Sequence, residues 1–437
     1  MSKPEARRIH RDQHGINPEY IDRHARSVIE TLLDAGYDAY LVGGCVRDLI
    51  LRKKPKDFDV ATNALPEQIA PLFRRSRIIG KRFRLVHVRF GREVIEVATF
   101  RAGADLVDDL ETTDAGRIIS DNVYGEEYED AFRRDFTINA LFYDIRDDAV
   151  LDYVGGFADL QSRKLHVIGD PEKRFREDAV RMLRAIRFSA KLDLTLETDL
   201  VNTIKRLSYL LEDQSRARLF DEVIKLLQGG AAVKTMSLMC EFGFVEMLFP
   251  PLDQQRLCET LNDCSSLLCR ALKNTDKRIR QGKSVTPAFM FAALLWEPVR
   301  QRYEELLARR VPPITAMDKA AMEVLERQAA RVIVPKRFSV PMRDIWTMQL
   351  RLPRRGGRRA FSLLSHRRFR AAYDFLLLRC EVGEEDPALA QWWTRFQEVD
   401  ETEAVAMVRA LQPGKTGGSS RRRRRRKPKT RQANKPA

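Results

Sequence analysis

The sequence lacks several features that mark membrane, secreted and metal-binding proteins. Its longest apolar run, residues 287–296, is about half of the ~20 residues that a membrane-spanning helix needs. No apolar stretch follows the charges of residues 1–15, so we expect no secretory signal. Cysteine is scarce, with six among 437 residues and no C-x-x-C pair. We therefore expect reduced, mostly buried thiols in a cytoplasmic protein and no cysteine-bound metal.

Acidic residues are missing from one end of the chain. Residues 413–437 hold eleven Lys and Arg and no Asp or Glu, whereas the whole chain carries a net charge of +16. The other 412 residues therefore carry only +5. This end is an electrostatic arm suited to a polyanion. Residues 412–437 are also low in complexity and cannot bury apolar surface, so we predict a disordered basic tail.

The rest of the chain shows two kinds of pattern. Up to about residue 165, helical segments alternate with short β-like runs at residues 40–42, 58–62, 84–90 and 93–100. The last two runs flank a glycine-containing turn and predict a hairpin. Residues 136–145 form a fifth apolar run, for which strand and helix both remain open. Beyond about residue 170, apolar residues recur at helical spacing, which predicts a mixed α/β head followed by an all-α remainder.

Residues 41–62 (LVGGCVRDLILRKKPKDFDVAT) carry the richest chemistry. A predicted strand ends in Gly43 and Gly44, and a predicted helix begins at about Cys45, where backbone N–H groups can approach a phosphate closely. Arg47 lies in the first turn of that helix and can add a charge-assisted hydrogen bond to a triphosphate. Asp57 and Asp59 would share one face of a strand and repel each other unless cations such as Mg²⁺ neutralise them. Each feature alone is usually a plain turn, but their combination at this spacing is far more specific.

This segment resembles motif A of the class II nucleotidyltransferases, the family of tRNA CCA-adding enzymes and bacterial poly(A) polymerases. The resemblance implies an α+β protein with a palm-like nucleotidyltransferase head, built on a five-stranded mixed sheet and followed by all-α neck, body and tail regions. It also implies that Asp57 and Asp59 hold two Mg²⁺ ions and that Asp48, beside Arg47, belongs to the nucleotide site. We expect the catalytic head, the base-recognising neck, the RNA-binding body and the disordered tail at residues 1–165, 166–235, 236–411 and 412–437.

Residues 133–140 (RRDFTINA) match a second motif of the family. The resemblance implies that Asp135 completes the carboxylate cluster and that Arg134 and Asn139 lie near the incoming sugar and phosphates. An arginine beside a carboxylate suits recognition of a ribose hydroxyl, although the same pair can be a surface ion pair. Glu96 is an acid within the apolar run 93–100, and we hold it as a further candidate acid near the metals.

Residues 176–188 (REDAVRMLRAIRF) predict a helix with Glu177, Arg181 and Arg184 on one face. A charged helical face of this kind is most often solvated. The ED-x-x-R pattern, however, resembles the family motif whose acid and arginine read the base edge of the bound nucleotide. Here that acid and arginine are Asp178 and Arg181, with Glu177 beside them, and they would recognise adenine without a template.

Other segments indicate which branch of the family the chain represents. Residues 78–88 (IIGKRFRLVHV) resemble the stretch that marks bacterial poly(A) polymerases, as do residues 333–338, 343–346 and 369–374. Residues 354–370 interleave Arg with Phe, a mixture suited to neutralising the backbone of single-stranded RNA and stacking on its bases. We therefore expect a polynucleotide adenylyltransferase that adds AMP from ATP to RNA 3′ ends and promotes RNA turnover.

Two other functions share parts of this pattern. A tRNA CCA-adding enzyme uses the same chemistry but accepts CTP before ATP. A non-catalytic RNA-binding protein could keep the fold without the reaction, but the complete set of Asp57, Asp59 and Asp135 favours catalysis. By resemblance, the partners would be ATP, single-stranded RNA 3′ ends and RNA-decay proteins, for a monomeric, cytoplasmic enzyme without a transmembrane segment.

Overall fold

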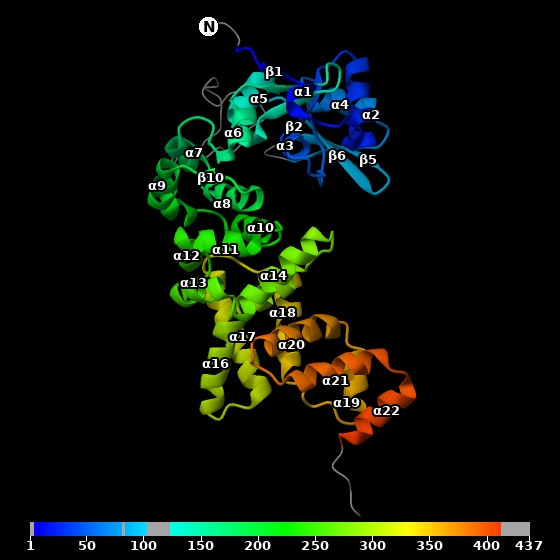
Figure 1. Ribbon diagram of the computed structural model, residues 1–437, viewed down its shortest axis with the longest axis vertical. Helices are drawn as coiled ribbons and strands as arrows, with labels where there is room; N and C mark the ends of the chain where they lie inside the picture. The colour runs from blue at the N-terminus through cyan, green and yellow to red at the C-terminus, as the bar shows by residue number, and fades with distance from the viewer. Residues whose placement is uncertain (1–3, 81–83, 103–122, 412–437) are drawn as a thin grey trace, which may run out of the picture. The chain divides into compact units, whose positions relative to one another are not determined.

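The computed structural model describes residues 4–80, 84–102 and 123–411, which form two compact units (Figure 1). The first unit ends at Arg343 and the second begins at Asp344, so the predicted body region, residues 236–411, divides between them. None of the helices within the described ranges is long and apolar enough to cross a membrane. The predicted tail, residues 412–437, lies outside the described residues, as do residues 81–83 of the stretch 78–88.

A mixed sheet forms the head, in the strand order β1-β8-β7-β2-β3-β6-β5-β4 (Figure 1). Within the described residues it has eight strands, not the five predicted from the sequence. Strands β3 and β6 run parallel, and the other neighbours are antiparallel. The strands are β1 (Arg7–His10), β2 (Ala39–Val42), β3 (Asp59–Thr62), β4 (Ser76–Ile79), β5 (Leu85–Phe90), β6 (Glu93–Thr99), β7 (Leu141–Asp144) and β8 (Ala149–Asp152).

The three additional strands are β1, β4 and β8, which the sequence pattern does not reveal. Strands β1 and β4 are the edges of the sheet, and their four-residue sequences RRIH and SRII are too short and too polar to show alternation. Strand β8 is only four residues long and is buried throughout, so it has no polar side to mark it. The undecided run at residues 136–145 contains both a 3₁₀ turn, η3 (Thr137–Asn139), and strand β7.

The predicted hairpin at residues 84–100 is confirmed as β5 and β6. On one side of it, Val86 and Val97 are buried, and helices α2 (Arg23–Asp34) and α4 (Pro66–Leu72) pack against these strands. The opposite side carries the exposed residues Arg89, Val94 and Glu96. One face of the hairpin therefore belongs to the core, and the other is open among the described residues. The other helices of the head are α1 (Arg11–His14), α3 (Gly44–Ile50), α5 (Glu127–Arg133) and α6 (Gly156–Ser162).

Helices dominate the rest of the first unit, as the sequence predicts. A short parallel pair, β9 (Lys164–Leu165) and β10 (Thr195–Leu196), crosses the head–neck boundary expected at residue 165. The apolar run at residues 287–296 contains the buried helix α15. The helices are α7 (Pro171–Glu177), α8 (Val180–Leu192), α9 (Thr198–Leu207), α10 (Arg216–Leu227), α11 (Ala232–Glu241), α12 (Phe244–Leu248), α13 (Gln254–Asp263), α14 (Leu267–Arg280), α15 (Pro287–Leu294), α16 (Trp296–Ala308) and α17 (Pro313–Ala329).

The second unit is helical and packs around Trp393, which is fully buried. Phe361 and Phe369 belong to this core, Phe361 against Phe396 with ring centroids 5.2 Å apart and Phe369 against Trp393 at 5.1 Å. The expectation that these rings stack on RNA bases is therefore wrong for Phe369, whose ring is buried in the core, whereas Phe361 packs against that core and is only partly buried. The helices are α18 (Lys336–Gln349), which contains the junction, α19 (Arg358–Leu364), α20 (Phe369–Glu381), α21 (Pro387–Glu398) and α22 (Glu401–Ala410).

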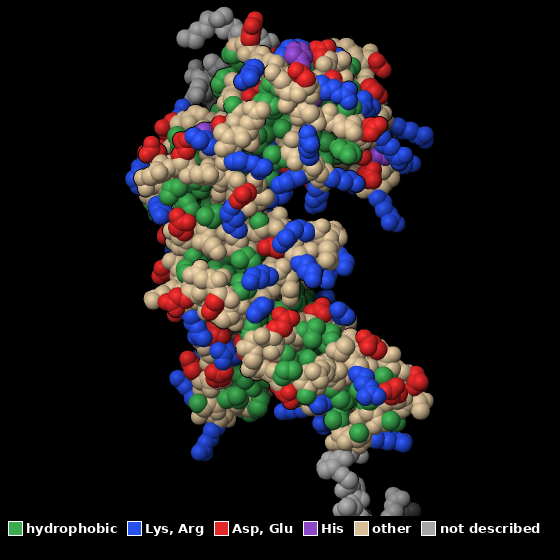
Figure 2. All heavy atoms as spheres, in the orientation of Figure 1, with side chains coloured by type: hydrophobic (Ala, Val, Ile, Leu, Met, Phe, Trp, Pro, Cys, Tyr) green, Lys and Arg blue, Asp and Glu red, His purple; other side chains and the backbone are tan. Residues whose placement is uncertain are grey.

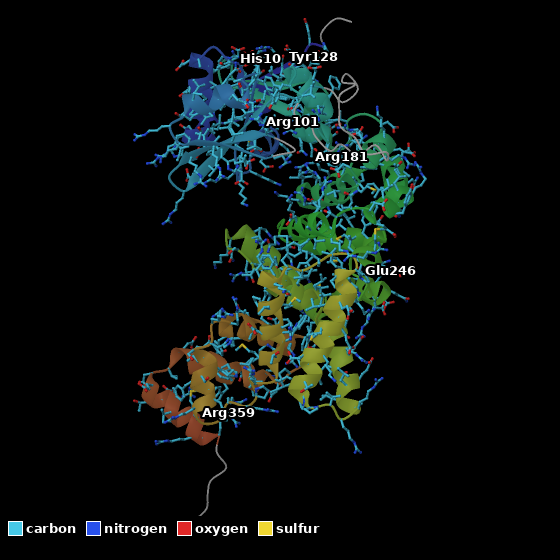
Figure 3. All side chains as sticks on the ribbon, turned by 180° about the vertical axis from the view of Figure 1, so that it is seen from behind. His10, Arg101, Tyr128, Arg181, Glu246 and Arg359 are labelled. Carbon is cyan, nitrogen blue, oxygen red and sulfur yellow. A yellow bond between two sulfur atoms is a disulfide. The ribbon has the colours of Figure 1, made fainter. Side chains whose placement is uncertain are left out.

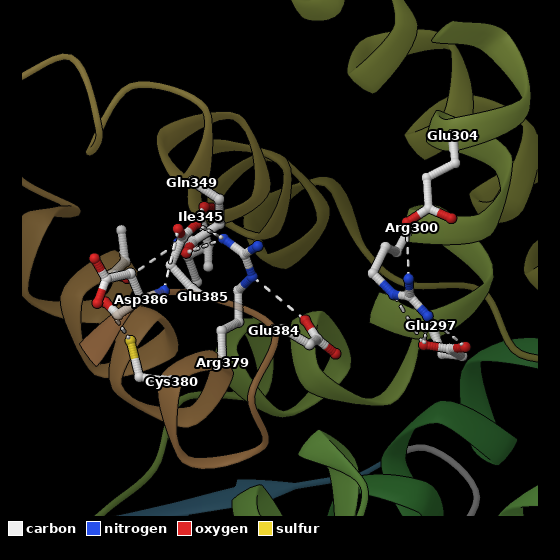
Figure 4. Close-up of polar contacts among 11 residues, drawn as sticks. Glu297, Arg300, Glu304, Ile345, Gln349, Arg379, Cys380, Glu384, Glu385 and Asp386 are labelled. Atoms are coloured by element: carbon white, nitrogen blue, oxygen red, sulfur yellow. Dashed lines mark hydrogen bonds and ion pairs between the residues drawn. The ribbon is translucent and has the colours of Figure 1, made fainter. Parts of the chain in front are cut away.

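Many arginines serve the fold and are neutralised locally. In the second unit, Arg379 donates to Gln349 and pairs with Glu384 and Glu385 at 3.4 and 3.2 Å (Figure 4). In the first unit, Arg300 is held between Glu297 and Glu304 at 2.9 and 2.7 Å.

Two of the six cysteines are not the reduced thiols that we expected. Cys264, at the end of α13, forms a disulfide with Cys269 of α14. The positive φ of 54° at Cys264 turns the chain sharply between the two helices and brings the Cα atoms within 5.1 Å. The other four cysteines are free, and among them only Cys45 is fully buried.

Candidate active site

A cleft of about 470 Å³ lies between the head and helix α8. It contains most of the side chains that the sequence singled out, together with several that it did not. The lining residues are Gly43, Gly44, Arg47, Asp59, Arg134, Asp135, Asn139, Asp178, Arg181, Arg184, Arg187, Phe188 and Lys191.

The turn between β2 and α3 brings the backbone close to the wall of the cleft. Gly43 has φ 76° and ψ −124°, a conformation that side-chain-bearing residues rarely adopt. A Cβ atom at this position would lie 3.1 Å from Nη1 of Arg134. Helix α3 begins at Gly44, one residue before the start predicted at about Cys45, and the Cβ position of Gly44 lies 3.6 Å from Nη2 of Arg47. The glycines therefore leave room for two guanidinium groups beside an open backbone.

The two motif A aspartates differ in their surroundings. Strand β3 begins at Asp59, whereas Asp57 lies before it, in a bend, and is exposed, so the two do not sit on one strand as we expected. Asp59 lies opposite Glu96 in the parallel register of β3 and β6. Burial and the charge of Glu96 raise the pKa of Asp59 to about 6, with a further contribution from Asp57, although Arg134 opposes the shift. Arg134 therefore offsets the burial of Asp59 and the charge of its neighbouring carboxylates only in part.

Glu96 is half-exposed rather than buried in its strand. Its Oε1 lies 3.2 Å from Nε2 of His87, the residue opposite it on β5. Within the described residues, no three acidic, His or Cys side chains form a ready metal-binding group. Two carboxylates nevertheless suffice for Mg²⁺ when substrate phosphates complete its coordination.

Asp135 has quite different contacts. Its Oδ1 accepts hydrogen bonds from the Phe136 amide at 2.9 Å and from Nδ2 of Asn139 at 3.1 Å. Its Oδ2 accepts a hydrogen bond from Nε of Arg184 at 2.7 Å and forms an ion pair with Nη2 of the same residue at 2.6 Å. Burial alone would raise the pKa of Asp135, but Arg184 and these hydrogen bonds lower it below its usual value. Asp135 is thus an ionised anchor between the head and α8.

The arginines of the two head motifs are joined through Asn139. Nη1 of Arg47 donates to Oδ1 of Asn139 at 2.6 Å, and its Nε and Nη2 donate to Asp48 at 2.9 and 2.7 Å. Nη1 of Arg134 donates to the Asn139 carbonyl at 3.2 Å, while its Nη2 pairs with Asp130 at 2.7 Å. The carboxylates of Asp48 and Asp130 therefore fix the direction of both guanidinium groups at the cleft.

The predicted single helix over residues 176–188 is interrupted. Helix α7 ends at Glu177, and Asp178 has extended dihedral angles before α8 begins at Val180. Oδ1 of Asp178 accepts a hydrogen bond from the Val180 amide at 3.2 Å, and its Oδ2 accepts one from Nη2 of Arg218 at 2.5 Å. Nη1 of Arg181 donates to Glu177 and to the Arg174 carbonyl, each at 2.8 Å (Figure 3). The three base-recognition candidates are therefore adjacent, but they sit at a helix junction.

Helix α8 adds cleft residues that the sequence analysis missed. Beyond Arg181 and Arg184, the cleft is lined by Arg187, Phe188 and Lys191. The spacing of positions 181, 184, 188 and 191 is that of one helical face and could have revealed them. Burial lowers the pKa of Lys191, and the charges of Arg47 and Arg187 lower it further, although Asp48 opposes the shift. Such an excess of positive charge suits a polyanion such as a triphosphate.

A second basic hollow, of about 480 Å³, lies in the second unit. Four exposed arginines border it on and before helix α19, among them Arg359, which is labelled in Figure 3. Its lining residues are Arg351, Arg354, Arg358, Arg359, Ser362 and Leu363.

Family comparisons match the chain in three segments. Residues 39–166 match the Poly A polymerase head domain, residues 193–256 match the "Probable RNA and SrmB- binding site of polymerase A", and residues 309–429 match the Polymerase A arginine-rich C-terminus.

Individual relatives agree with these matches. The Poly(A) polymerase I of Escherichia coli O157:H7 is 45% identical over 91% of this chain and 87% of its own length. The CCA-adding enzyme of Bacillus subtilis is 38% identical, but over only 51% of this chain and 55% of its own. A crystal structure of the Bacillus stearothermophilus CCA-adding enzyme in complex with CTP shares the fold, with a TM-score of 0.60 and 24% identity over 91% of this chain and 89% of that one.

Proposed function

Because this chain belongs to the bacterial poly(A) polymerase family, we propose that it adds AMP units from ATP to RNA 3′ ends without a template. One observation carries the choice within the wider family: the similarity to Poly(A) polymerase I extends over 91% of the chain, whereas that to a CCA-adding enzyme covers 51%. The arginine-rich C-terminal match supports the same choice.

The triphosphate of ATP is held at the β2–α3 turn. Gly43 and Gly44 let the backbone approach the phosphates, and Arg47 supplies a positive charge whose direction Asp48 and Asn139 fix. Arg134 lies 3.1 Å from the Cβ position of Gly43 and so faces the same phosphates. Positive charge on this side of the cleft stabilises the departing pyrophosphate.

Asp57 and Asp59 fit a Mg²⁺ site, because Asp59 lines the cleft opposite Glu96 and Asp57 adds a second carboxylate, whose charges Arg134 offsets only in part. When bound, Mg²⁺ supplies positive charge that stabilises the attacking and leaving oxygens of the phosphoryl transfer. Asp135 contributes by holding Asn139 and Arg184 in place from the same cleft wall. Glu96 remains a further candidate acid beside Asp59.

The base of ATP is recognised where α7 meets α8. Glu177 holds Arg181 through Nη1, which leaves the rest of a five-donor guanidinium to face a base edge. Asp178 supplies a carboxylate acceptor for an exocyclic amino group such as that of adenine. A fixed donor and acceptor pair at this junction would select one base without a nucleic-acid template.

The arginines of the second unit and the basic tail hold the RNA. Arg351, Arg354, Arg358 and Arg359 border a hollow whose lining contains no aromatic ring, so they suit the phosphate backbone of any sequence. ATP and RNA 3′ ends occur together in the bacterial cytoplasm, which is the compartment that this proposal implies. We also propose that the enzyme is a monomer and that it acts together with RNA-decay proteins.

Incorporation of nucleotides tests the proposal. We expect the purified protein with Mg²⁺ to add many residues to a generic single-stranded RNA when ATP is supplied, and few when CTP alone is supplied. A parallel reaction contains tRNA that lacks its 3′ CCA. An enzyme that requires the tRNA end, uses CTP first and stops after three additions would be a CCA-adding enzyme, and a protein that binds RNA without extending it would be the non-catalytic alternative.

A further inference from the structure

Four charged or polar residues form a row across neighbouring strands of the head sheet. Asp59 of β3 lies opposite Glu96 of β6, Glu96 opposite His87 of β5, and His87 opposite Arg77 of β4. Partners in register point to the same face of a sheet, and neighbouring strands lie ~4.8 Å apart. The row therefore begins at the candidate catalytic aspartate and runs across three strands to the edge of the sheet.

The face that carries this row is open among the described residues. Arg77 and Arg89 are exposed, Glu96 is half-exposed, and Val94 is 38% exposed although it is apolar. The buried side chains of the same hairpin point the other way, toward α2 and α4. Figure 2 shows Lys and Arg side chains gathered at this end of the head.

The geometry of phosphoryl transfer indicates from which side of Asp59 the RNA 3′-hydroxyl approaches. In phosphoryl transfer, the attacking and leaving oxygens are roughly in line on opposite sides of the phosphorus. In the proposed function, the triphosphate binds on the β2 and α3 side of Asp59, where Gly43, Gly44 and Arg47 line the cleft. Strand β6 flanks β3 on the other side. The attacking 3′-hydroxyl must therefore reach Asp59 from the side of β6 and β5.

We propose that the exposed face of β4, β5 and β6 receives the 3′-terminal nucleotides of the RNA. This inference rests on the proposed function, and it locates the RNA end rather than the ATP. It concerns a surface of the first unit, separate from the arginine-lined hollow of the second unit, which suits RNA further upstream.

The residues of the row, and Val94 and Arg89 on the same face, have side chains that fit this ligand. Glu96 lies next to Asp59, and its carboxylate can accept a hydrogen bond from a terminal ribose hydroxyl. His87 orients Glu96 at 3.2 Å and presents part of its ring, on which a base can stack. The exposed apolar surface of Val94 is available to the same base or ribose. Arg77 and Arg89 lie farther from Asp59, where backbone phosphates of the preceding nucleotides would pass.

The first test separates RNA binding from ATP binding. We expect the double variant Arg77→Ala/Arg89→Ala to raise the KM for RNA about tenfold and to leave the KM for ATP unchanged. Two lost phosphate contacts should also reduce the slope of log K for RNA against log salt by ~1.4. The matched control is Arg7→Ala, which removes one exposed charge from β1 at the opposite edge of the same sheet.

Photo-crosslinking provides a test that needs no variant. RNA carrying 4-thiouridine at its 3′ terminus should crosslink to peptides that contain β5 and β6 of the wild-type protein. Crosslinks confined to other segments, or an unchanged KM for RNA in the double variant of a protein that still extends RNA with ATP, would overturn this inference alone. A wild-type protein that cannot extend RNA with ATP would instead overturn the proposed function.

Discussion

At the scale of single residues, the cleft holds carboxyl groups in opposite electrostatic surroundings. Burial and Glu96 raise the pKa of Asp59, whereas Arg184 and two hydrogen bonds lower that of Asp135 despite its burial. A carboxylate with a raised pKa gains from a cation, and one with a lowered pKa already has its partner. This difference separates the proposed metal ligand from the proposed anchor, which their sequence motifs alone do not do.

Replacing either motif A aspartate should abolish polymerisation without preventing RNA binding. We expect Asp57→Ala and Asp59→Asn to lower ATP incorporation at least tenfold, because each loses a proposed metal ligand, while the arginines that we propose hold the RNA are unchanged. Without Mg²⁺, the folded protein disfavours the ionised carboxylate of Asp59, so Asp59→Asn should not lower the Tm of the metal-free protein. Extension above a tenth of wild type, measured with labelled ATP, would contradict the metal assignment.

Asp135→Asn should destabilise the protein in a pH-dependent way. Its folded pKa lies below the ordinary value of 3.8, so the ion pair with Arg184 stabilises the fold fully above that pH and loses its effect as the pH falls through the folded pKa. We expect the variant to lose about 2 kcal/mol of unfolding free energy from pH 5 to 8. In urea titrations the difference should shrink below about pH 4, and a constant difference would argue against an ionised Asp135.

Sequence motifs identified these residues but not the contacts that they share. Gly43, Arg47, Asp59, Asp135 and Asn139 all reach one cleft, although they come from segments far apart in the chain. The hydrogen bond from Arg47 to Asn139, for example, spans 2.6 Å and joins residues 92 positions apart. Such partners are set by tertiary packing, which no local pattern contains. The half-exposure of Glu96 likewise depends on tertiary packing, because helices α2 and α4 cover the opposite face of its hairpin.

At the scale of elements, the β2–α3 turn depends on a glycine for two reasons. Gly43 combines a positive φ with a Cβ position 3.1 Å from Arg134, whereas Gly36 has a positive φ and no atom within 4 Å. Gly43→Ala and Gly36→Ala should both lose about 1–3 kcal/mol of unfolding free energy. Only Gly43→Ala should raise the KM for ATP, because it displaces the guanidinium. An equal rise in both variants would mean that backbone strain alone matters.

Elements with strong periodicity could be predicted, and short or interrupted ones could not. The β5–β6 hairpin follows from two apolar runs around a glycine turn. The break at Asp178 could not be foreseen, because residues 176–188 contain no Gly or Pro and match a helix throughout. At the break, Asp178 makes a tertiary contact with Arg218, which lies 40 residues further along the chain.

At the scale of the whole molecule, positive charge is concentrated where RNA would be held. The tail after Leu411 carries eleven Lys and Arg, and the hollow of the second unit adds four more arginines. Ending the chain after Leu411 should leave the enzyme folded and active but weaken its RNA binding. Each lost phosphate contact lowers the slope of log K against log salt by ~0.7 for single strands. An unchanged slope in filter-binding assays would assign the tail to another partner.

The division of the molecule could be predicted only in part from the sequence. The change from a mixed head to a helical remainder follows from periodicity, but the junction at residue 343 falls inside helix α18 and has no Gly or linker to mark it. The sequence does not show that the ring of Phe369 is buried, because its burial depends on helices further along the chain.

The composition of the added tail tests the central claim most directly. The purified enzyme is incubated with a generic single-stranded RNA, Mg²⁺ and all four nucleoside triphosphates at equal concentration, and the new 3′ ends are sequenced. We predict long tails composed almost entirely of A, because the base site that we propose at α7 and α8 would select adenine at every addition. Tails that end after C-C-A, or tails of mixed composition, would contradict a template-independent poly(A) polymerase.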